Sequence, residues 1–557
     1  MQESEHRISP TYSPLYNGRG QELAGYTSAI TKERLDWAQV RQHATHLSTA
    51  LVKKYGLHKT DTVAIFSQNS VWYLVALYAA IRVGARVTGP SPAYGVDEMT
   101  HALKITAARF IITAPNCVPV AAAAVDKVGI PHDHIFTIEG EFDGFTTIKE
   151  LIKIGKNYGK SGQVPACTIP AGLKNGEVCA FLNFSSGTTG LPKAVMLSHQ
   201  NAIAQIIQLD QITPKEPKRK LGVLPFSHIA GLLFTCLSPV FLNEEVVLCP
   251  SFNMPSMISA ISEFKLTDMI LVPPIVIRLV HDLIVDNYDL SSVKRIVCGA
   301  APLSNQIIQL LAQKLPHWGF GQAYGMTECF SIAHHPPEFY DFKYGDAGGT
   351  LFANTVVKIV DEDGNELGYN QPGKILVRGP QIAMGYLNNE AATRETFDAD
   401  GFLHTGDIGT IDEAGFIHIT DRIKEMIKVK GIAVAPAELE DLLLGHPDVE
   451  DCAVLGILDD YAGERPKAYV VLKPGRKPSE DMGRRLLAYV MEKKKARYKW
   501  IREVEFAESV PKSPSGKILR RVLRDKERRK TPVGGGSGSG SAYGLVVKLQ
   551  EGERTKL

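Results

Sequence analysis

Short apolar runs of strand length alternate with helical patterns over the first 310 residues of the chain. Apolar residues recur at helical spacing over residues 32–55, and strand-like runs follow at residues 62–66 and 110–112. The same alternation returns beyond residue 199. Strands that alternate with helices in this way predict parallel sheets covered by helices, so we expect an α/β fold.

Between about residues 350 and 420 the runs shorten, and Asp-Gly, Pro-Gly and Ala-Gly pairs separate them, which predicts a small antiparallel unit. A chain of 557 residues is too long for one hydrophobic core. We expect an N-terminal domain over residues 1–421 and a C-terminal α+β domain over residues 422–531. A Gly/Ser linker with a tail occupies residues 532–557.

The composition narrows the functional classes. Basic and acidic residues number 62 and 60, so nothing global favours nucleic acid or a membrane surface. The longest apolar run, residues 71–81, is shorter than the roughly 20 residues that a membrane helix needs. The eight cysteines lie far apart without metal-ligand spacing, which favours reduced thiols in an intracellular protein.

Residues 184–193 read Phe-Ser-Ser-Gly-Thr-Thr-Gly-Leu-Pro-Lys and lie between two strand-like runs. The glycines permit close backbone approach, and the hydroxyls and the lysine supply donors for phosphate oxygens. The spacing differs from the P-loop pattern, and a flexible surface loop is the alternative. The candidate ligands are Ser185, Ser186, Gly187, Thr188, Thr189, Gly190 and Lys193.

Three further stretches offer groups for a nucleotide. Residues 298–303, Cys-Gly-Ala-Ala-Pro-Leu, follow a strand, where ligands sit in open α/β sheets. Residues 321–328, Gly-Gln-Ala-Tyr-Gly-Met-Thr-Glu, combine an aromatic face for a base with the carboxylate of Glu328 for Mg²⁺. Asp407, in a glycine-flanked turn, can accept from ribose hydroxyls. Structural turns and Asx capping are the alternatives.

Two basic segments follow in the last domain. Residues 421–431 read Asp-Arg-Ile-Lys-Glu-Met-Ile-Lys-Val-Lys-Gly, and residues 511–520 read Pro-Lys-Ser-Pro-Ser-Gly-Lys-Ile-Leu-Arg. Such segments are commonly solvated faces. In the second one, however, a Pro-Ser-Gly turn projects the single side chain of Lys517.

In this order, the motifs closely resemble those of the acyl-adenylate-forming superfamily of AMP-binding enzymes, and most of all the acyl-CoA synthetases that are similar to 4-coumarate-CoA ligase. The resemblance covers about residues 25–530. It implies a large N-terminal domain of two βα sheets with a small β-barrel, and a small mobile C-terminal α+β domain. It also implies ATP, Mg²⁺, coenzyme A and a small carboxylic acid.

The resemblance assigns roles to positions of this sequence. The loop of residues 185–193 would hold the ATP β- and γ-phosphates, with Thr188 and Glu328 at the metal. The acid pocket would be lined by His228, Ile229, Ala230, Phe234, Gly299, Met326 and Phe330. The other nucleotide and coenzyme A positions would be Ala300, Ala301, Gln322, Ala323, Tyr324, Gly325, Thr327, Asp407, Arg422, Lys424, Lys430 and Gly431. A satisfied core histidine is an equal alternative for His228.

A carboxylate that attacks the α-phosphate of ATP brings anion to anion, so the site must supply positive charge, for which we choose Lys517. By resemblance, the C-terminal domain then turns about Lys424 and brings Lys428 to the site for thioester formation. The expected catalytic residues are Lys517, Lys428, His228 and Glu328.

Three positions depart from the pattern of plant coumarate ligases: two of them concern the thioester step and one concerns the acid pocket. Ala433 replaces their typical Gln, Ala230 replaces a Tyr, and Ser251 stands where a basic residue often meets coenzyme A. The missing ring enlarges one side of the pocket, while Phe330 can fill the other. We therefore expect a hydrophobic acid, either aryl or medium-chain.

Two other functions stay open from the sequence: loading of a carrier protein's phosphopantetheine thiol, and a non-catalytic scaffold role. The end Thr555-Lys556-Leu557 resembles the peroxisomal S-K-L signal but has Thr in place of Ser. We accordingly expect a cytoplasmic or a peroxisomal protein.

Overall fold

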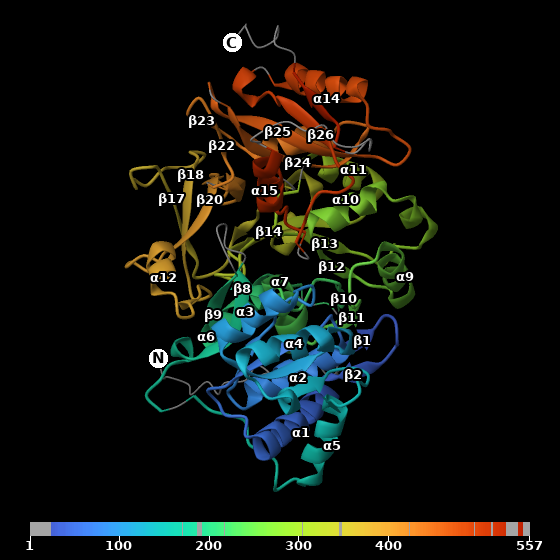
Figure 1. Ribbon diagram of the computed structural model, residues 1–557, viewed down its shortest axis with the longest axis vertical. Helices are drawn as coiled ribbons and strands as arrows, with labels where there is room; N and C mark the ends of the chain where they lie inside the picture. Colours follow the sequence, from blue (N-terminus) through green and yellow to red (C-terminus); the bar gives the residue numbers. More distant parts are fainter. Residues whose placement is uncertain are drawn as a thin grey trace.

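The computed structural model describes residues 24–169, 171–185, 192–214, 216, 218–303, 305–344, 348–422, 424–459, 461–494, 496–513, 516–530 and 544–549. Figure 1 shows a large N-terminal domain below a smaller C-terminal domain, which is coloured orange to red. Sheets and helices combine in both domains, which confirms the predicted α/β class.

An eight-stranded sheet with the order β19-β9-β8-β4-β3-β5-β6-β7 forms the first unit. Its strands are β3 (Thr62–Phe66), β4 (Arg86–Thr88), β5 (Ala108–Thr113), β6 (Ile135–Thr137), β7 (Thr146–Thr147), β8 (Cys179–Ser185), β9 (Lys193–Ser198) and β19 (Gly385–Tyr386). The accompanying helices are α1 (Trp37–Tyr55), α2 (Val71–Arg82), α3 (Val96–Thr106), α4 (Val118–Val128) and α5 (Ile148–Asn157). Every residue of α2 is buried, as expected for a core helix.

Helix α1 begins at Trp37 and not at residue 32, so the predicted start was wrong. The Asp36 carboxylate accepts from Gln39 N at 2.7 Å, and Gln39 Oε1 accepts from Asp36 N at 2.9 Å. This capping box fixes the first turn. Residues before it pair as strand β2 (Arg34–Asp36).

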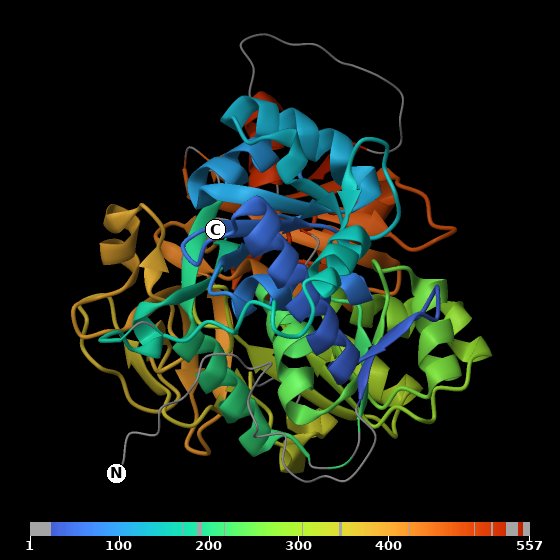
Figure 2. The same cartoon turned by 90° about the horizontal axis from the view of Figure 1, so that it is seen from below.

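A nine-stranded sheet with the order β16-β15-β14-β13-β12-β10-β11-β1-β2 forms the second unit. Its other strands are β1 (Gly25–Ser28), β10 (Arg219–Gly222), β11 (Glu245–Leu248), β12 (Asp268–Leu271), β13 (Arg295–Cys298), β14 (Gly319–Tyr324), β15 (Ala333–His334) and β16 (Thr350–Leu351). Helices α9 (Met254–Phe264), α10 (Pro273–His281) and α11 (Asn305–Lys314) pack in the core of this unit. The buried apolar residues of α6 (His199–Ile212), α7 (Ile229–Gly231) and η4 (Leu232–Leu237) pack in the core of the first unit, and α8 (Ser238–Leu242) follows η4. Figure 2 shows the dark-blue β1–β2 hairpin beside the green part of the chain, because β1 pairs with β11.

The predicted antiparallel unit is a four-stranded sheet. Its elements are β17 (Val356–Val360), β18 (Gly373–Arg378), β20 (Leu403–Ile411), β21 (Ile417–Arg422) and helix α12 (Glu390–Thr396). The order is β17-β18-β20-β21, and within the described residues its edge strands are not paired with each other. The sheet is therefore open rather than the closed barrel that the resemblance implies.

The C-terminal domain contains a six-stranded sheet and three helices among its described residues. The strands are β22 (Ile427–Val429), β23 (Ile432–Val434), β24 (Val449–Asp459), β25 (Gly463–Leu472), β26 (Glu503–Phe506) and β27 (Val546–Lys548). The helices are α13 (Pro436–Leu444), α14 (Glu480–Lys493) and α15 (Arg520–Lys530).

Strand β27 comes from the segment that the sequence presented only as a tail. It pairs antiparallel with β26, and Val547 and Leu549 are 3% and 6% exposed. A Cβ on Gly483 of α14 would lie 2.4 Å from Val547 Cγ2, so a glycine is needed at this crossing. The tail segment is thus an integral edge of the C-terminal sheet.

None of the described helices combines the length and the apolar character needed to cross a membrane. All eight cysteines are free. The Gly/Ser linker and the final Thr555-Lys556-Leu557 lie outside the described residues.

The docked tail makes a stability prediction. Val547→Asp should lower the free energy of unfolding by at least about 2 kcal/mol, because it removes a buried side chain and buries a charge. Lys548→Gln is the control: this side chain is 61% exposed, and its 3.0 Å pair with Glu503 should contribute less than about 1 kcal/mol. Denaturant unfolding measures both variants, and equal stability would contradict the docking.

Candidate active site

The Lys517 loop of the C-terminal domain lies on the N-terminal domain, at the end of β12. Gly516 has φ +82, and a Cβ there would come within 2.9 Å of Pro274 Cδ and 3.1 Å of Val272 Cγ2. The carboxyl ends of parallel strands are the usual ligand edge of such sheets. The close approach of Gly516 therefore sets Lys517 at this edge.

Hydrogen bonds within the loop define the direction of Lys517. Lys517 N donates to Ser513 Oγ at 3.1 Å, and Ser513 N donates to Lys517 O at 2.8 Å. The neighbouring Lys512 Nζ pairs with Asp451 Oδ2 at 2.6 Å. The first lysine of the motif is consequently fastened to β24, while the second one projects toward the N-terminal domain.

Lys517 and His228 share one electrostatic environment. Burial and the Arg422 guanidinium lower the pKa of Lys517 to about 8, against the opposing pull of the Glu425, Asp407 and Glu328 carboxylates. Burial and the Lys517 ammonium lower the pKa of His228 to about 4. Ala230 N donates to His228 Nδ1 at 3.2 Å, so the neutral ring carries its proton on Nε2. The charge of Lys517 therefore acts on the His228 ring.

Asp407 lies at the junction of three strands and is 3% exposed. Tyr324 Oη, at the end of β14, donates to Asp407 Oδ2 at 2.6 Å. Arg422 Nε, at the end of β21, pairs with Asp407 Oδ1 at 3.1 Å. This arrangement joins an aromatic ring, a carboxylate and a guanidinium, a set that suits a nucleoside.

Glu328 and the lysine of the glycine-rich loop meet through Tyr386. Tyr386 Oη donates to Glu328 Oε1 at 2.9 Å, and Lys193 Nζ lies 4.7 Å from the centre of the Tyr386 ring. Glu328 is 3% exposed, and among the described residues its Oε2 has no hydrogen-bond donor. Sequence reasoning missed Tyr386, which belongs to no motif.

The loop itself is only partly described. Ser185 pairs across from Lys193 at the end of the β8–β9 hairpin. The predicted phosphate ligands Ser186, Gly187, Thr188, Thr189 and Gly190 lie outside the described residues. In the described part of the chain, no group of three or more His, Cys, Asp or Glu residues could hold a metal.

The predicted adenine frame is a tight backbone turn. Ala300 has the left-handed φ of 72, and Leu303 N donates to Gln322 Oε1 at 3.2 Å. Gly325 packs so closely that a Cβ would lie 2.2 Å from Phe330 O. The side chain of Gln322 therefore stabilises the turn by accepting from its backbone. Ala300, Ala301, Ala323 and Thr327 lie at or near the carboxyl ends of β13 and β14.

The predicted acid pocket is partly buried. Ile229 and Phe330 are each 4% exposed, and Phe330 has φ 56. The side chains of Ala230, Phe234 and Met326, with Gly299, are intermediate in exposure. Phe330 packs in the hydrophobic core that contains α1, α2 and β3, so its ring forms a closed wall on one side of the predicted pocket.

The lysines predicted for thioester formation lie elsewhere. Lys428 and Lys430 are exposed on the β22–β23 hairpin, with Gly431 at its turn. Lys430 Nζ donates to Tyr461 Oη at 3.2 Å, and Ala433 pairs across from Lys428. Lys424 is exposed in the segment between the domains. The lysine whose charge lowers the pKa of His228 is thus Lys517 and not Lys428.

Comparisons with known proteins find matches along most of the chain. The AMP-binding enzyme family matches residues 21–387, and the AMP-binding enzyme C-terminal domain matches residues 438–517. 4-Coumarate:CoA ligase 1 of Petunia hybrida is 38% identical over 92% of this chain and 94% of that protein. 4-Coumarate--CoA ligase 2 of Oryza sativa subsp. japonica is 36% identical over 93% of each.

A solved structure is also similar over nearly the whole chain. The anthranilate CoA ligase AuaEII, in complex with anthranoyl-AMP, gives a TM-score of 0.82 at 25% identity and covers 94% of this chain and 99% of that chain.

Tyr386→Phe tests the contact with Glu328. The change keeps the ring beside Lys193 but removes a donor to a buried carboxylate, so stability should fall by about 1–3 kcal/mol. Tyr369→Phe, at a side chain that is 64% exposed, should leave stability unchanged. Chemical denaturation without nucleotide compares them, and equal stability would argue against a strong Tyr386–Glu328 bond.

Proposed function

Because the chain belongs to the AMP-binding enzyme family, as an AMP-forming acid–thiol ligase similar to 4-coumarate-CoA ligases, we propose that it activates a hydrophobic carboxylic acid and transfers it to coenzyme A. In the first step, the acid attacks the α-phosphate of ATP and pyrophosphate leaves. In the second, the thiol attacks the acyl-adenylate and AMP leaves. The electrostatic coupling of Lys517 to His228, Arg422 and Asp407, together with the Asp407–Arg422 ion pair, supports this proposal.

Each group in the site has a task in the first step. Lys517 supplies the positive charge that brings the acid carboxylate to the α-phosphate. Asp407 and Arg422 hold the ribose, and Tyr324 fixes the Asp407 carboxylate. His228, neutral and donating from Nε2, orients the acid at the mouth of the pocket.

The residues around Glu328 fit a magnesium ion. Its buried carboxylate has one oxygen held by Tyr386 and the other oxygen unbonded among the described residues, which is a suitable oxygen ligand. Magnesium would neutralise and orient the phosphates of ATP. We propose that Glu328, together with Thr188, holds it.

For the second step, the C-terminal domain turns about Lys424. Arg422 is tied to Asp407 of the N-terminal domain, whereas Glu425 is tied to Arg520 of the C-terminal domain. The pivot therefore falls between these two anchors. The turn withdraws Lys517 and presents Lys428 and the Lys430–Gly431 segment to the thiol.

A panel of acids tests the reaction and the substrate class. Pyrophosphate release should depend on a hydrophobic aryl or medium-chain acid, and AMP formation should depend on coenzyme A. Release without turnover by coenzyme A would favour a carrier-protein thiol, in keeping with the exposed Ser251 that replaces a basic residue. A strong preference for acetate or a free amino acid would refute the pocket assignment.

Separate half-reactions test the two lysines. Lys517→Ala should reduce adenylation at least a hundredfold and leave thioester formation from supplied acyl-AMP nearly unchanged, because only the first step joins two anions. Lys428→Ala should show the reverse. Equal loss of both steps in both variants would sink the two-position assignment.

The pH dependence of adenylation follows from Lys517. Its lowered pKa of about 8 means that the required charge is present below pH 8 and is lost as the pH rises through that value. Adenylation at low ATP should therefore fall above about pH 8. In Lys517→Arg the guanidinium stays charged, so the residual activity should not show this fall. An identical alkaline limb in both enzymes would assign it to another group.

A further inference from the structure

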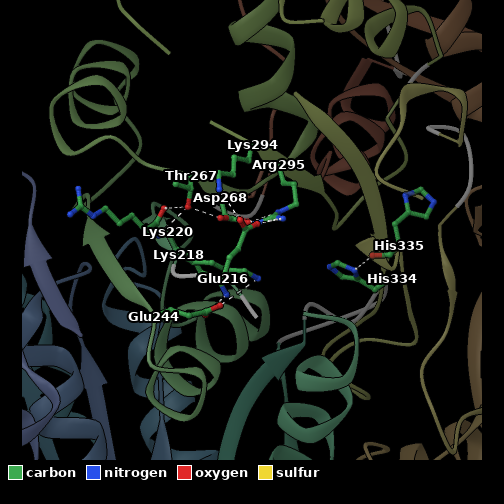
Figure 3. Close-up of polar contacts among 11 residues, drawn as sticks. Glu216, Lys218, Lys220, Glu244, Thr267, Asp268, Lys294, Arg295, His334 and His335 are labelled. Carbon is green, nitrogen blue, oxygen red and sulfur yellow. Dashed lines mark hydrogen bonds and ion pairs between the residues drawn. The ribbon is translucent and has the colours of Figure 1, made fainter. Parts of the chain in front are cut away.

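A second cluster of buried charges lies at the opposite ends of the same strands. Lys218 and Lys220 flank the start of β10, Asp268 begins β12 and Arg295 begins β13. Figure 3 shows these side chains together with Glu216, Glu244 and Lys294, and His334 reaches toward them from β15. Because the strands are parallel, this cluster lies at their amino ends and the Lys517 site lies at their carboxyl ends.

The cluster borders a cavity of about 40 Å³. This volume holds roughly three water molecules, or one oxyanion group. Charged lining comes from Lys218, Lys220, Arg295 and Asp268. The apolar walls are formed by Leu209, Ile212, Phe234, Leu242, Met269 and Val297.

Three cations line the cavity against one carboxylate, Asp268, while Glu244 and Glu216 pair with these cations from outside the lining. Asp268 accepts from Arg295 Nε at 2.8 Å and from Thr267 Oγ1 at 2.6 Å, so its carboxylate is engaged. Glu244 serves both lysines: Lys220 pairs with it at 2.5 Å, but Lys218 lies 3.7 Å away, beyond hydrogen-bond distance. In the whole cluster, four cations face three carboxylates.

Lys218 is the group with unused donors. Its side chain is 6% exposed, and among the described residues its Nζ has no hydrogen-bond acceptor. Burial and the neighbouring Lys220 ammonium lower its pKa to about 8. Arg295 Nη2 is likewise buried without a hydrogen-bond partner in the described part of the chain. Buried cations of this kind are normally paired.

We propose that this cavity binds one oxyanion group, a carboxylate or a phosphate, with Lys218, Lys220 and Arg295 as its ligands. The group can belong to a free anion. It can also be the distal end of the acid substrate, because Phe234, Ser238 and Leu242 line the cavity at intervals of four along η4 and α8, and Ala230 lies one turn nearer to His228. That second source rests on the proposed function.

Thermal unfolding of the full chain in sodium phosphate, against sodium chloride of equal ionic strength, tests the free anion. The melting temperature of the wild type should rise. Lys218→Met should lose the rise and Lys218→Arg should keep it. Lys294→Met is the matched control: Lys294 pairs with Glu216 in the same cluster but is 52% exposed and does not line the cavity, so the rise should persist.

Adenylation kinetics test the substrate source, with monocarboxylic acids and α,ω-dicarboxylic acids of equal length. Lys218→Met should raise KM for the dicarboxylic acids at least tenfold and leave KM for the monocarboxylic acids unchanged.

The results of these measurements separate the possibilities. A rise in melting temperature with phosphate that Lys218→Met removes supports the site and identifies a free anion as its ligand. A KM effect confined to dicarboxylic acids supports the site and identifies the distal carboxylate of the substrate as its ligand. Absence of both in the wild type overturns the proposal. If Lys218→Met does not fold, soaking wild-type crystals with selenate decides, because a cavity without an anomalous peak also overturns it. Failure of every acid to release pyrophosphate would contradict the proposed function but leave the phosphate result intact.

Discussion

The Asp407 carboxylate is the contact on which the geometry of the active site depends. Its two oxygens join Tyr324 of the nine-stranded sheet to Arg422, the last described residue of the antiparallel sheet. The residues that follow Arg422 enter the C-terminal domain. One buried carboxylate therefore fixes Tyr324 relative to Arg422, and with them the proposed base platform, the proposed ribose site and the start of the proposed pivot. Loss of either partner would leave charge or polarity unpaired in a dry environment.

Arg422 and Asp407 also act on the charge of Lys517, in opposite directions. With pyrophosphate and adenylate in place, the surrounding anions favour its charged form. Without them, burial and Arg422 disfavour that form, as the lowered pKa shows. In the proposed mechanism, departure of pyrophosphate would remove part of the attraction between Lys517 and the ligand. This electrostatic change gives the proposed rotation a direction.

Apolar periodicity in the sequence predicted much of the fold, because the apolar residues of each pattern are the ones that the fold buries. Strand β3 has the predicted bounds, and all five of its residues are buried. The start of α1 was misplaced because apolar spacing continues past the Asp36 cap. Strand β27 was missed because a short segment behind a flexible linker shows no pairing partner until β26 and Gly483 form a surface for it.

The site was predictable only where its residues fall in motifs. Lys517, His228 and Asp407 could be placed together, whereas Tyr386 could not, because its role arises from the pairing of the distant strands β19 and β9. Lys218 and Arg295 are 77 residues apart in sequence and look like ordinary surface charges. Only parallel pairing of β10, β12 and β13 buries their side chains around one cavity.

The helical segment that connects His228 to the charged cavity affects which acid the pocket can accept. His228 and Ser238 are ten positions apart along a helical segment that includes the π-helix η4. Phe234, which the resemblance assigns to the acid pocket, also lines the charged cavity. An acid that reached Lys218 would have to be an extended chain and would have to displace Phe234 from its contact with His334. Phe234 is therefore the residue that distinguishes an aryl acid from an extended-chain acid as the substrate.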